Sequence, residues 1–395
     1  MKRQLLFITT IFFVSLSLWG QSIKDNAKII QKNYFEEVDF EILYGKIIVP
    51  VTIDDKTYRF ILDTGAPNLI SEKVAKEVNL TNVQVISVKD ANNSVENLSL
   101  GTVGSIKVGN IHSEQNTVLI SAINEHPLLK CYNIDGLLGS NFFKNSILKI
   151  SLTQKKLWIT DKVKKLNLSV SPSKLKLVGN QLAPFIKVNF LNNENLEGTE
   201  ELMIDTGMDG FYEISNRSFA EFKDADFFTI LSTASGTGSV GLFGAGNENE
   251  QYLLQTDYFK INQTQFSNLI TNTTEDQNSR IGIGVLEYGD MTLDFKNKKF
   301  YFEAVDKITL QEPVPIYVPT MLDNKLIIGF VWDAEYSDLL QYGDEILRIG
   351  THKISETDLC NTLKLREYRT QNSSHELEIK TKDNQIKTVK IISKY

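Results

Sequence analysis

Two acidic residues stand in nearly identical sequence contexts. Asp63 lies in RFILDTGAPNLIS and Asp205 lies in ELMIDTGMDGFYEIS, and each follows apolar residues and precedes threonine and glycine. Hydrolysis of a peptide without a metal needs one carboxylate that takes a proton from water and one carboxyl that donates a proton to the carbonyl oxygen. Two carboxyls about 3 Å apart can share a single proton, because both cannot ionise at that distance. The two segments therefore predict a catalytic pair, Asp63 and Asp205.

The residues beside each aspartate fit such a pair. Gly65 and Gly207 permit a tight turn and a close approach of the opposite segment, where a side chain would block it. The hydroxyls of Thr64 and Thr206 can form hydrogen bonds between the two segments and hold them rigid. We expect these four residues to support the aspartates. We expect no cofactor and no metal ion in the reaction.

The aspartate segments belong to an internal repeat. The two aspartates are 142 positions apart, and the similar segments SLTQKKLWIT and DFKNKKFYFE align at an offset of 143 positions. Two pairs of segments at nearly one offset predict two related lobes, roughly residues 38–161 and 162–304. Alternating apolar and polar residues with Asn, Asp and Gly turns, as in GKIIVPVTIDDKTYRFIL, indicate mainly β-structure in both lobes.

Together these features resemble the aspartic peptidases, in which each of two lobes contributes one DTG loop. The resemblance implies a mainly β, bilobal pepsin-like fold with two retropepsin-like β-barrel lobes. It extends to an apolar-apolar-glycine strand behind each loop, which is Leu137–Gly139 in the first lobe. In the second lobe the constant offset pairs Gly139 with Gly282 and puts Arg280 at the first apolar position. Gly284 offers a rival alignment.

The resemblance implies an endopeptidase that acts on extended polypeptides. Pepsin-like enzymes usually carry a hydroxyl residue after the glycine, and its hydrogen bonds lower the pKa of the carboxylates. Ala66 and Met208 stand at these positions, so we expect an optimum at roughly pH 5 to 6, less acidic than that of pepsin. We expect a hairpin with its turn at Asp90–Ser94 to cover the substrate. The glycine-rich region SGTGSVGLFGAG is its expected counterpart in the second lobe.

Residues 305–395 predict a small, separate α+β domain. It contains the strand LIIGFVW, the segment YGDEILRIG, a short helical pattern at Ser355–Leu365, and the strands HELEIKT and TVKIIS. The pattern resembles PDZ domains, and Gly343–Asp344 and Ile346–Leu347 carry the likeness. Such domains bind the C-termini of peptides by adding a strand to a sheet edge. A peptide C-terminus is therefore one expected partner, and a packing or tethering role is the alternative.

The first twenty residues are typical of a secretory signal. Lys2 and Arg3 precede the apolar run LLFITTIFFVSLSLW, and the small residue Gly20 follows it. The run is too short to indicate a membrane span, and a retained N-terminal anchor is the alternative. We expect an exported protein, periplasmic or secreted, with a signal peptide at 1–20, an N-terminal segment at 21–37 and no stable membrane span after signal removal.

Charge and cysteine content restrict the partners and the crosslinks. The formal net charge of −7 argues against nucleic acid, because phosphate binding needs a basic face. The lysines between Lys155 and Lys176 alternate with apolar residues, as on the solvated face of a sheet. Cys131 and Cys360 are the only cysteines and lie far apart in the sequence, in different predicted domains. We therefore expect no disulfide between them.

Other readings of these motifs are weaker. A non-catalytic peptide-binding protein would share the fold and the PDZ-like domain. A glycosidase also uses two carboxylates, but they lie roughly 5 to 9.5 Å apart. Gly236, Gly238 and Gly241 fit the dinucleotide pattern G-x-G-x-x-G, but no helix follows, which favours a hairpin. The four histidines lack the spacing of metal ligands.

Overall fold

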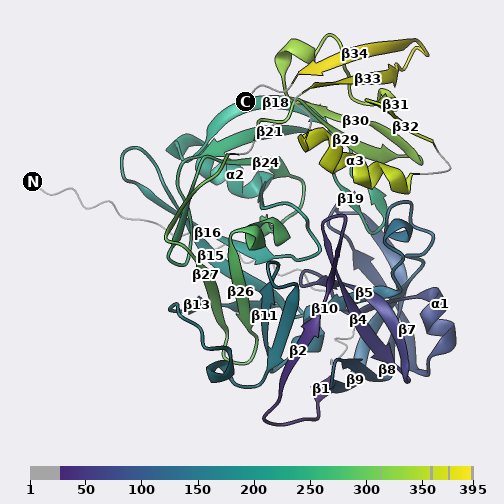
Figure 1. Cartoon of the computed structure of the whole chain (residues 1–395), viewed down its shortest axis with the longest axis vertical. Helices are drawn as coiled ribbons and strands as arrows, with labels where there is room; N and C mark the ends of the chain where they lie inside the picture. Colours follow the sequence, from purple (N-terminus) through teal and green to yellow (C-terminus); the bar gives the residue numbers. More distant parts are fainter. Residues whose placement is uncertain (1–26, 312, 356–358, 372–373, 393–395) are drawn as a thin grey trace, which may run out of the picture.

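Strands dominate the described chain and form two large sheets, a six-stranded sheet between them and a C-terminal sheet (Figure 1). The expected signal peptide, residues 1–20, lies outside the described residues. Among the described helices none is long and apolar enough to cross a membrane. The computed structural model of the protein describes residues 27–311, 313–355, 359–371 and 374–392.

The first large sheet is built by the first half of the chain, residues 27–160. Its strand order is β1-β9-β6-β10-β5-β4-β8-β7, and β3 pairs with β4. Asp54 and Asp55 have φ angles of 47° and 61° and form the turn between β4 and β5 that the alternating pattern predicts. The strands are β1 (Lys28–Ile29), β3 (Glu41–Leu43), β4 (Lys46–Ile53), β5 (Lys56–Asp63), β6 (Leu69–Ser71), β7 (Leu80–Lys89), β8 (Val95–Val108), β9 (Ile111–Ser121) and β10 (Gly136–Gly139).

The second large sheet is built by the second half, residues 173–309. Its order is β18-β21-β24-β17-β25-β16-β15-β22-β23-β28, and β14 pairs with β15. Because β28 pairs with β23, this sheet continues past residue 304. The strands are β14 (Lys176–Val178), β15 (Ala183–Leu191), β16 (Glu197–Ile204), β17 (Tyr212–Ser215), β18 (Thr229–Gly236), β21 (Asn249–Thr256), β22 (Phe259–Ile261), β23 (Thr264–Ser267), β24 (Leu269–Thr274), β25 (Arg280–Ile281) and β28 (Lys307–Thr309).

A six-stranded sheet of order β13-β27-β26-β11-β12-β2 joins the two halves (Figure 1). Its central pair, β11 and β26, comes from different halves, and the stacked rings of Phe143 and Phe295 continue this contact in the core. Since β2 pairs with β12, the chain is already part of the sheet before residue 38. The strands are β2 (Phe35–Asp39), β11 (Ile147–Ser151), β12 (Lys156–Thr160), β13 (Ser173–Lys174), β26 (Gly289–Asp294) and β27 (Lys299–Ala304).

The repeat in the sequence is also a repeat in structure. After each DTG segment a short strand, β6 or β17, leads into a short helix, α1 (Glu72–Glu77) or α2 (Asn216–Phe222). The hydroxyls of Ser71 and Ser215 cap these helices by accepting hydrogen bonds from backbone N–H groups in the first turn. The segment SEKVAKEVNL predicts the first helix, and α1 is shorter than this segment. The sequence does not predict α2.

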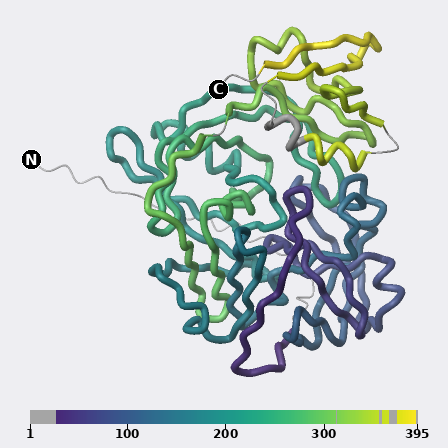
Figure 2. Tube along the Cα trace, viewed as in Figure 1, coloured from purple at the N-terminus to yellow at the C-terminus, as the bar shows by residue number. Residues whose placement is uncertain are grey.

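The last part of the chain forms a C-terminal unit with its own sheet, at the end of the path in Figure 2. The sheet order is β29-β30-β31-β33-β34, and β32 pairs with β31. Pro319 lies on the edge strand β29, and helix α3 (Cys360–Gln371) begins later than the pattern predicted from Ser355. The strands are β29 (Tyr317–Leu322), β30 (Lys325–Val331), β31 (Glu345–Ile349), β32 (His352–Lys353), β33 (Ser374–Lys380) and β34 (Ile386–Ile392).

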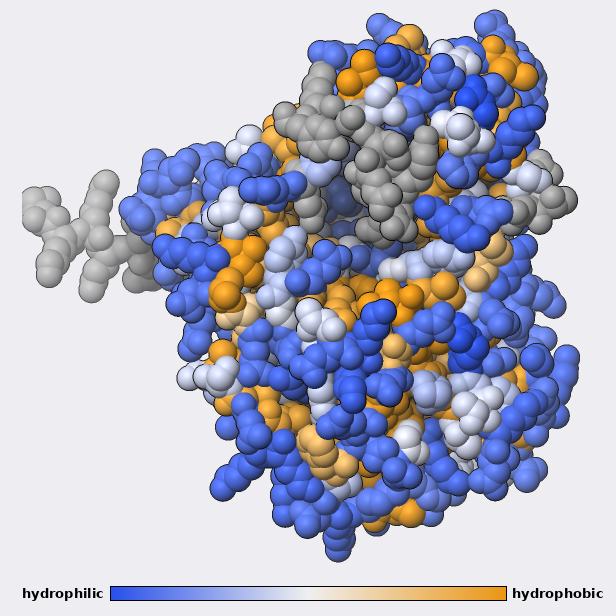
Figure 3. Space-filling view, in the orientation of Figure 1, coloured by the Kyte–Doolittle hydropathy of each residue, from blue (hydrophilic) through white to orange (hydrophobic). Residues whose placement is uncertain are grey.

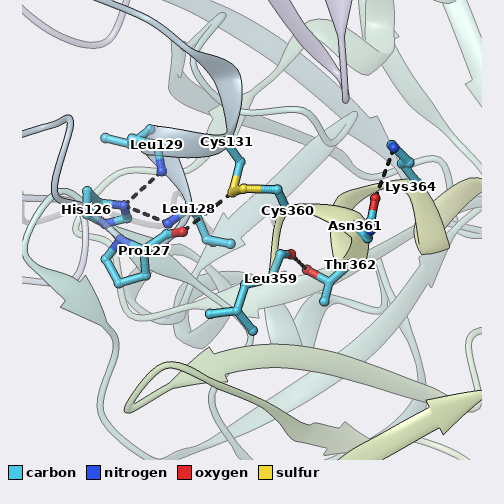
Figure 4. Close-up of a disulfide and its surroundings, with 10 residues drawn as sticks. All are labelled: His126, Pro127, Leu128, Leu129, Cys131, Leu359, Cys360, Asn361, Thr362 and Lys364. Atoms are coloured by element: carbon cyan, nitrogen blue, oxygen red, sulfur yellow. Dashed lines mark hydrogen bonds between the residues drawn. A yellow bond between two sulfur atoms is a disulfide. The ribbon is translucent and has the colours of Figure 1, made fainter. Parts of the chain in front are cut away.

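The expectation that the two cysteines stay apart is wrong. Cys131 and Cys360 form a disulfide with a Cα–Cα distance of 5.1 Å, although 229 positions separate them (Figure 4). Cys131 follows Leu128, which packs against the core of the C-terminal unit, and Cys360 is the first residue of α3. The expectation was wrong because it relied on the separation of the cysteines in the sequence. That separation does not show that this loop of the first half packs against the C-terminal unit.

Candidate active site

Each DTG loop extends from the end of a strand that a parallel strand supports. In the first half Gly139 of β10 pairs with Asp63 of β5. In the second half Ile281 of β25 pairs with Ile204 of β16, and the N–H of Asp205 donates to the carbonyl of Ile281 at 2.9 Å. The backing strands therefore place both aspartates at corresponding positions of the repeat.

A glycine behind each loop permits this packing. A Cβ atom at Gly139 would lie 2.5 Å from the carbonyl oxygen of Ala66, and one at Gly282 would lie 2.5 Å from the carbonyl oxygen of Met208. No Cβ fits at that distance, so both positions require glycine. The constant offset therefore identified Gly282 correctly, and the rival alignment on Gly284 is excluded by the register of β25.

Four reciprocal hydrogen bonds lock the two loops together. The hydroxyl of Thr64 accepts from the N–H of Thr206 at 3.0 Å and donates to the carbonyl of Ile204 at 2.7 Å. The hydroxyl of Thr206 accepts from the N–H of Thr64 at 3.0 Å and donates to the carbonyl of Leu62 at 2.9 Å. Both threonines are buried. Each hydroxyl thus satisfies two backbone groups of the opposite loop, as the sequence predicts.

The two glycines bring each aspartate against the opposite loop. A Cβ atom at Gly65 would lie 2.8 Å from the Cγ of Asp205, and one at Gly207 would lie 2.6 Å from the Cγ of Asp63. Any side chain at either position would collide with a carboxyl group. The structure therefore gathers all six predicted site residues at one place between the two halves.

The two carboxyls accept different numbers of backbone hydrogen bonds. The Oδ1 of Asp63 accepts hydrogen bonds at 3.0 Å from the N–H groups of Gly65 and Ala66, and that of Asp205 accepts one at 2.9 Å from Gly207. Burial, followed by the negative charge of Asp205, raises the pKa of Asp63 to about 7, although these N–H groups and Lys46 oppose the rise. Asp63 therefore keeps a proton in the mildly acidic range.

Two cations lie close to the pair. The ammonium group of Lys46 donates to the carbonyl of Gly207 and lies 3.9 Å from Asp209. Arg280 reaches Asp205 from β25, with 3.4 Å between Nη1 and Oδ2. The sequence marked Arg280 as a departure from the apolar pattern, but it did not reveal this contact. Neither cation was predicted as a site residue.

Hairpins from the two halves contact each other. Two contacts join the turn between β7 and β8 to the second half. The carboxylate of Asp90 accepts a hydrogen bond from the N–H of Phe243 at 3.0 Å, and the side chain of Asn92 donates one to the carbonyl of Gly244 at 3.0 Å. Gly244 belongs to the small hairpin of β19 (Val240–Gly241) and β20 (Gly244–Ala245). The hairpins expected to cover the substrate therefore contact each other at their tips.

The C-terminal unit packs on both hairpins. Leu363 of α3 joins a hydrophobic cluster with Ile86 and Val88 of β7, and Val240 of β19 packs on the core of the unit. Figure 3 shows hydrophobic residues gathered in the middle of this face, below the unit. The C-terminal unit thus contacts both halves, and the disulfide links it covalently to the first half.

The geometry of the first half agrees with a known family. Residues 49–142 match the family model of aspartyl proteases. The match contains the first DTG loop and its backing strand, and it supports an aspartyl peptidase. The match ends before the second loop. The place of Asp205 beside the first loop therefore rests on the strand register and the hydrogen bonds between the two loops.

Two solved structures are among the chains similar to this one. Conglutin gamma, a basic 7S globulin from lupine seeds, has a TM-score of 0.42 and 11% identity, over 70% of this chain and 96% of its own. The aspartic proteinase from Irpex lacteus has a TM-score of 0.41 and 12% identity, over 69% of this chain and 97% of its own. No curated protein matches the sequence. In the described part of the chain no group of three or more His, Cys, Asp or Glu residues could hold a metal ion.

Proposed function

We propose that the protein is an aspartic endopeptidase of bilobal, pepsin-like architecture, with Asp63 and Asp205 as its catalytic residues. The observation that carries the proposal is the interlock of the two DTG loops, which brings each carboxyl against the glycine of the opposite loop. A pair held this closely can activate one water molecule between its members. The raised pKa of Asp63 supports the same conclusion, because a shared proton needs a carboxyl that retains it.

The chemistry requires no group beyond the pair and a water. The ionised carboxylate takes a proton from the water, and the water oxygen bonds to the carbonyl carbon of the peptide. The protonated carboxyl donates its proton to the carbonyl oxygen at the same time. When the carbon–nitrogen bond breaks, the nitrogen receives the proton taken from the water, and one hydroxyl of the tetrahedral intermediate returns a proton to the other carboxyl.

Cleavage of a peptide library tests this function. Asp63→Asn and Asp205→Asn should each abolish cleavage, whereas Asp306→Asn, at an exposed position, should leave it unchanged. Cleavage that survives both active-site substitutions would refute the proposal. If the wild type binds peptides without cleaving them and Asp63→Asn binds them equally well, the non-catalytic peptide-binding protein is the correct alternative.

For the C-terminal unit we propose a PDZ-like fold that acts as a tether. In the likeness to PDZ domains the segment LIIGFVW, which forms β30, is the strand that would receive a peptide. Strand addition needs a free edge on that strand, and β30 lies between β29 and β31. The disulfide and the packing of Leu363 on a hydrophobic cluster of the first half favour a fixed position. Titration with peptides that end in a free carboxylate should show no saturable binding to the unit. Binding lost on substitution of residues in β30 would contradict the tether.

Export is a further part of the proposal. Disulfides persist mainly in oxidising compartments outside the cytoplasm, which fits the expected signal peptide at 1–20. Expression of the full-length chain, followed by fractionation and N-terminal sequencing, tests it. We expect a protein in the periplasm or medium that has lost its first residues near Gly20. A full-length protein in the cytoplasm would contradict export.

A further inference from the structure

Arg280 breaks the symmetry of the repeat at the catalytic pair. Leu137 and Arg280 each pair with the residue two positions before an aspartate, so they occupy equivalent places behind Asp63 and Asp205. One aspartate therefore has an apolar neighbour on its backing strand, and the other has a guanidinium group. The two loops share the residues Asp-Thr-Gly, so this difference lies in the backing strands and not in the loops.

Arg280 is held by acidic side chains from three elements. Its guanidinium lies 3.4 Å from Asp205, 3.5 Å from Asp276 in the loop before β25, and 2.8 Å from Glu213 on β17. Only 11% of its side chain is exposed. A charge buried to this degree needs pairing, and the three carboxylates supply it. The guanidinium is therefore fixed beside Asp205.

Three other acidic groups and three cations, one of which is Arg280, lie around the pair. Glu213 and Asp276 approach from the second half, and Asp209 from the loop after the second aspartate. Lys46 approaches from the start of β4, and Lys89 acts on Asp276 from the end of β7. Burial is the largest cause of the raised pKa of both Asp63 and Asp276, and the charge of Asp205 adds to it.

We propose that Arg280 is a positioning residue that holds Asp205 as the carboxylate and leaves the shared proton on Asp63. The inference rests on the proposed peptidase function and assigns the two roles within it. Asp205 takes the proton from water, and Asp63 donates its proton to the carbonyl oxygen. A cation within about 4 Å favours the charged form of a carboxyl. Arg280 is such a cation for Asp205, whereas Asp63 has the apolar Leu137 in the equivalent place, and the charge of Lys46 opposes the effect of burial on Asp63 without an ion pair.

The test compares two substitutions at Arg280 with a control. Arg280→Leu repeats the residue of the first half, Arg280→Lys keeps the charge, and Arg217→Leu removes an exposed arginine on α2. We expect Arg280→Leu to move the acidic limb of the kcat profile to higher pH, with a small change in KM. The expected loss of kcat below pH 5 is about tenfold, because a shift of the limb by one pH unit lowers the ionised fraction of the carboxyl tenfold. Arg280→Lys should restore most of the acidic limb, and the control should match the wild type.

Two kinetic results would overturn the inference. A loss of kcat that is equal at every pH would show that Arg280 only supports the fold. A rise in KM without a shift of the acidic limb would show that it contacts the substrate instead. If Arg280→Leu does not fold, Arg280→Lys still tests the inference, because lysine keeps the positive charge. If the acidic limb of Arg280→Lys shifts as far as expected for Arg280→Leu, the charge at this position does not hold Asp205 as the carboxylate.

A measurement without turnover separates this inference from the proposed function. The ¹³Cγ resonances of Asp63 and Asp205, identified by their loss in the two asparagine variants, report ionisation directly. We expect Asp205 to be ionised at a pH where Asp63 is still protonated. In Arg280→Leu we expect this order of ionisation, Asp205 before Asp63, to be lost. A wild type that cleaves no peptide but shows this order refutes only the peptidase. An active wild type without it refutes only the role of Arg280.

Discussion

Replacement of Asp63 by asparagine should stabilise the protein at neutral pH while it removes activity. The pKa of Asp63 is raised from 3.8 to about 7 in the folded protein. The folded state therefore binds this proton over a range in which the unfolded state has released it, so the contribution is full below pH 4 and is lost as the pH rises through 7. That loss is on the order of 2 to 4 kcal/mol of unfolding free energy at pH 8. The asparagine variant has no proton to lose at this position, so its unfolding free energy does not contain this loss.

Chemical denaturation at several pH values measures this difference. The unfolding free energies of wild type and Asp63→Asn should diverge between pH 4 and pH 8 (roughly the two pKa values), with the variant more stable at the higher pH. Asp306→Asn, at an exposed position, should follow the wild type throughout. Asp205→Asn, inactive under the proposal, checks that self-cleavage does not distort the comparison. A constant offset between wild type and Asp63→Asn at all pH values would refute a pKa of Asp63 near 7.

The remaining predictions concern the loops and the disulfide. Gly65→Ala should abolish activity, because its Cβ would lie 2.8 Å from the Cγ of the opposite aspartate, whereas Gly104→Ala, with no atom within 4 Å of its Cβ, should be silent in the same kinetic assay. Thr206→Val should lower the unfolding free energy by about 2 to 4 kcal/mol, because it leaves two buried backbone groups unpaired, and Thr206→Ser should retain most of it. Replacing both Cys131 and Cys360 by alanine removes a crosslink across 229 positions and should cost up to roughly 5 kcal/mol. Hydrogen exchange should then become faster in β29–β34, and unchanged exchange there would contradict a tether.

The parts of the site that repeat in the sequence could be predicted from it. The DTG residues face each other because each half contributes the same loop at the same position, and a constant offset along the chain identifies equivalent positions. The offset also paired Gly139 with Gly282 and left Gly284 as a rival, and the parallel pairing of Ile281 with Ile204 decides for Gly282. Local alternation likewise predicted the turn between β4 and β5. The resemblance to aspartic peptidases predicted the hairpin around Asp90, which β7 and β8 form.

Contacts between distant segments could not be predicted in this way. The disulfide joins a loop of the first half to a helix of the C-terminal unit, and no local pattern at Cys131 or Cys360 encodes that proximity. The hydrogen bond of Asn92 with the carbonyl of Gly244 has the same origin. Arg280 was visible as a break in an apolar pattern, but its partners come from three elements of the fold. Each of these contacts depends on how the elements pack, which the sequence of one segment does not contain.

The repeated and the unrepeated residues of the site have different physical roles. Thr64 and Thr206 repeat, and their reciprocal hydrogen bonds fix how closely the two loops approach. If every neighbour repeated as well, the two carboxyls would have equal environments and neither would be preferred as acid or base. The charges break this equality, because Arg280 forms an ion pair with Asp205, whereas Asp63 has no ion pair among the described residues and Lys46 acts on its pKa only through its charge. Catalysis by a shared proton needs both properties, since the repeat sets the distance and the unequal charges set the direction in which the proton moves.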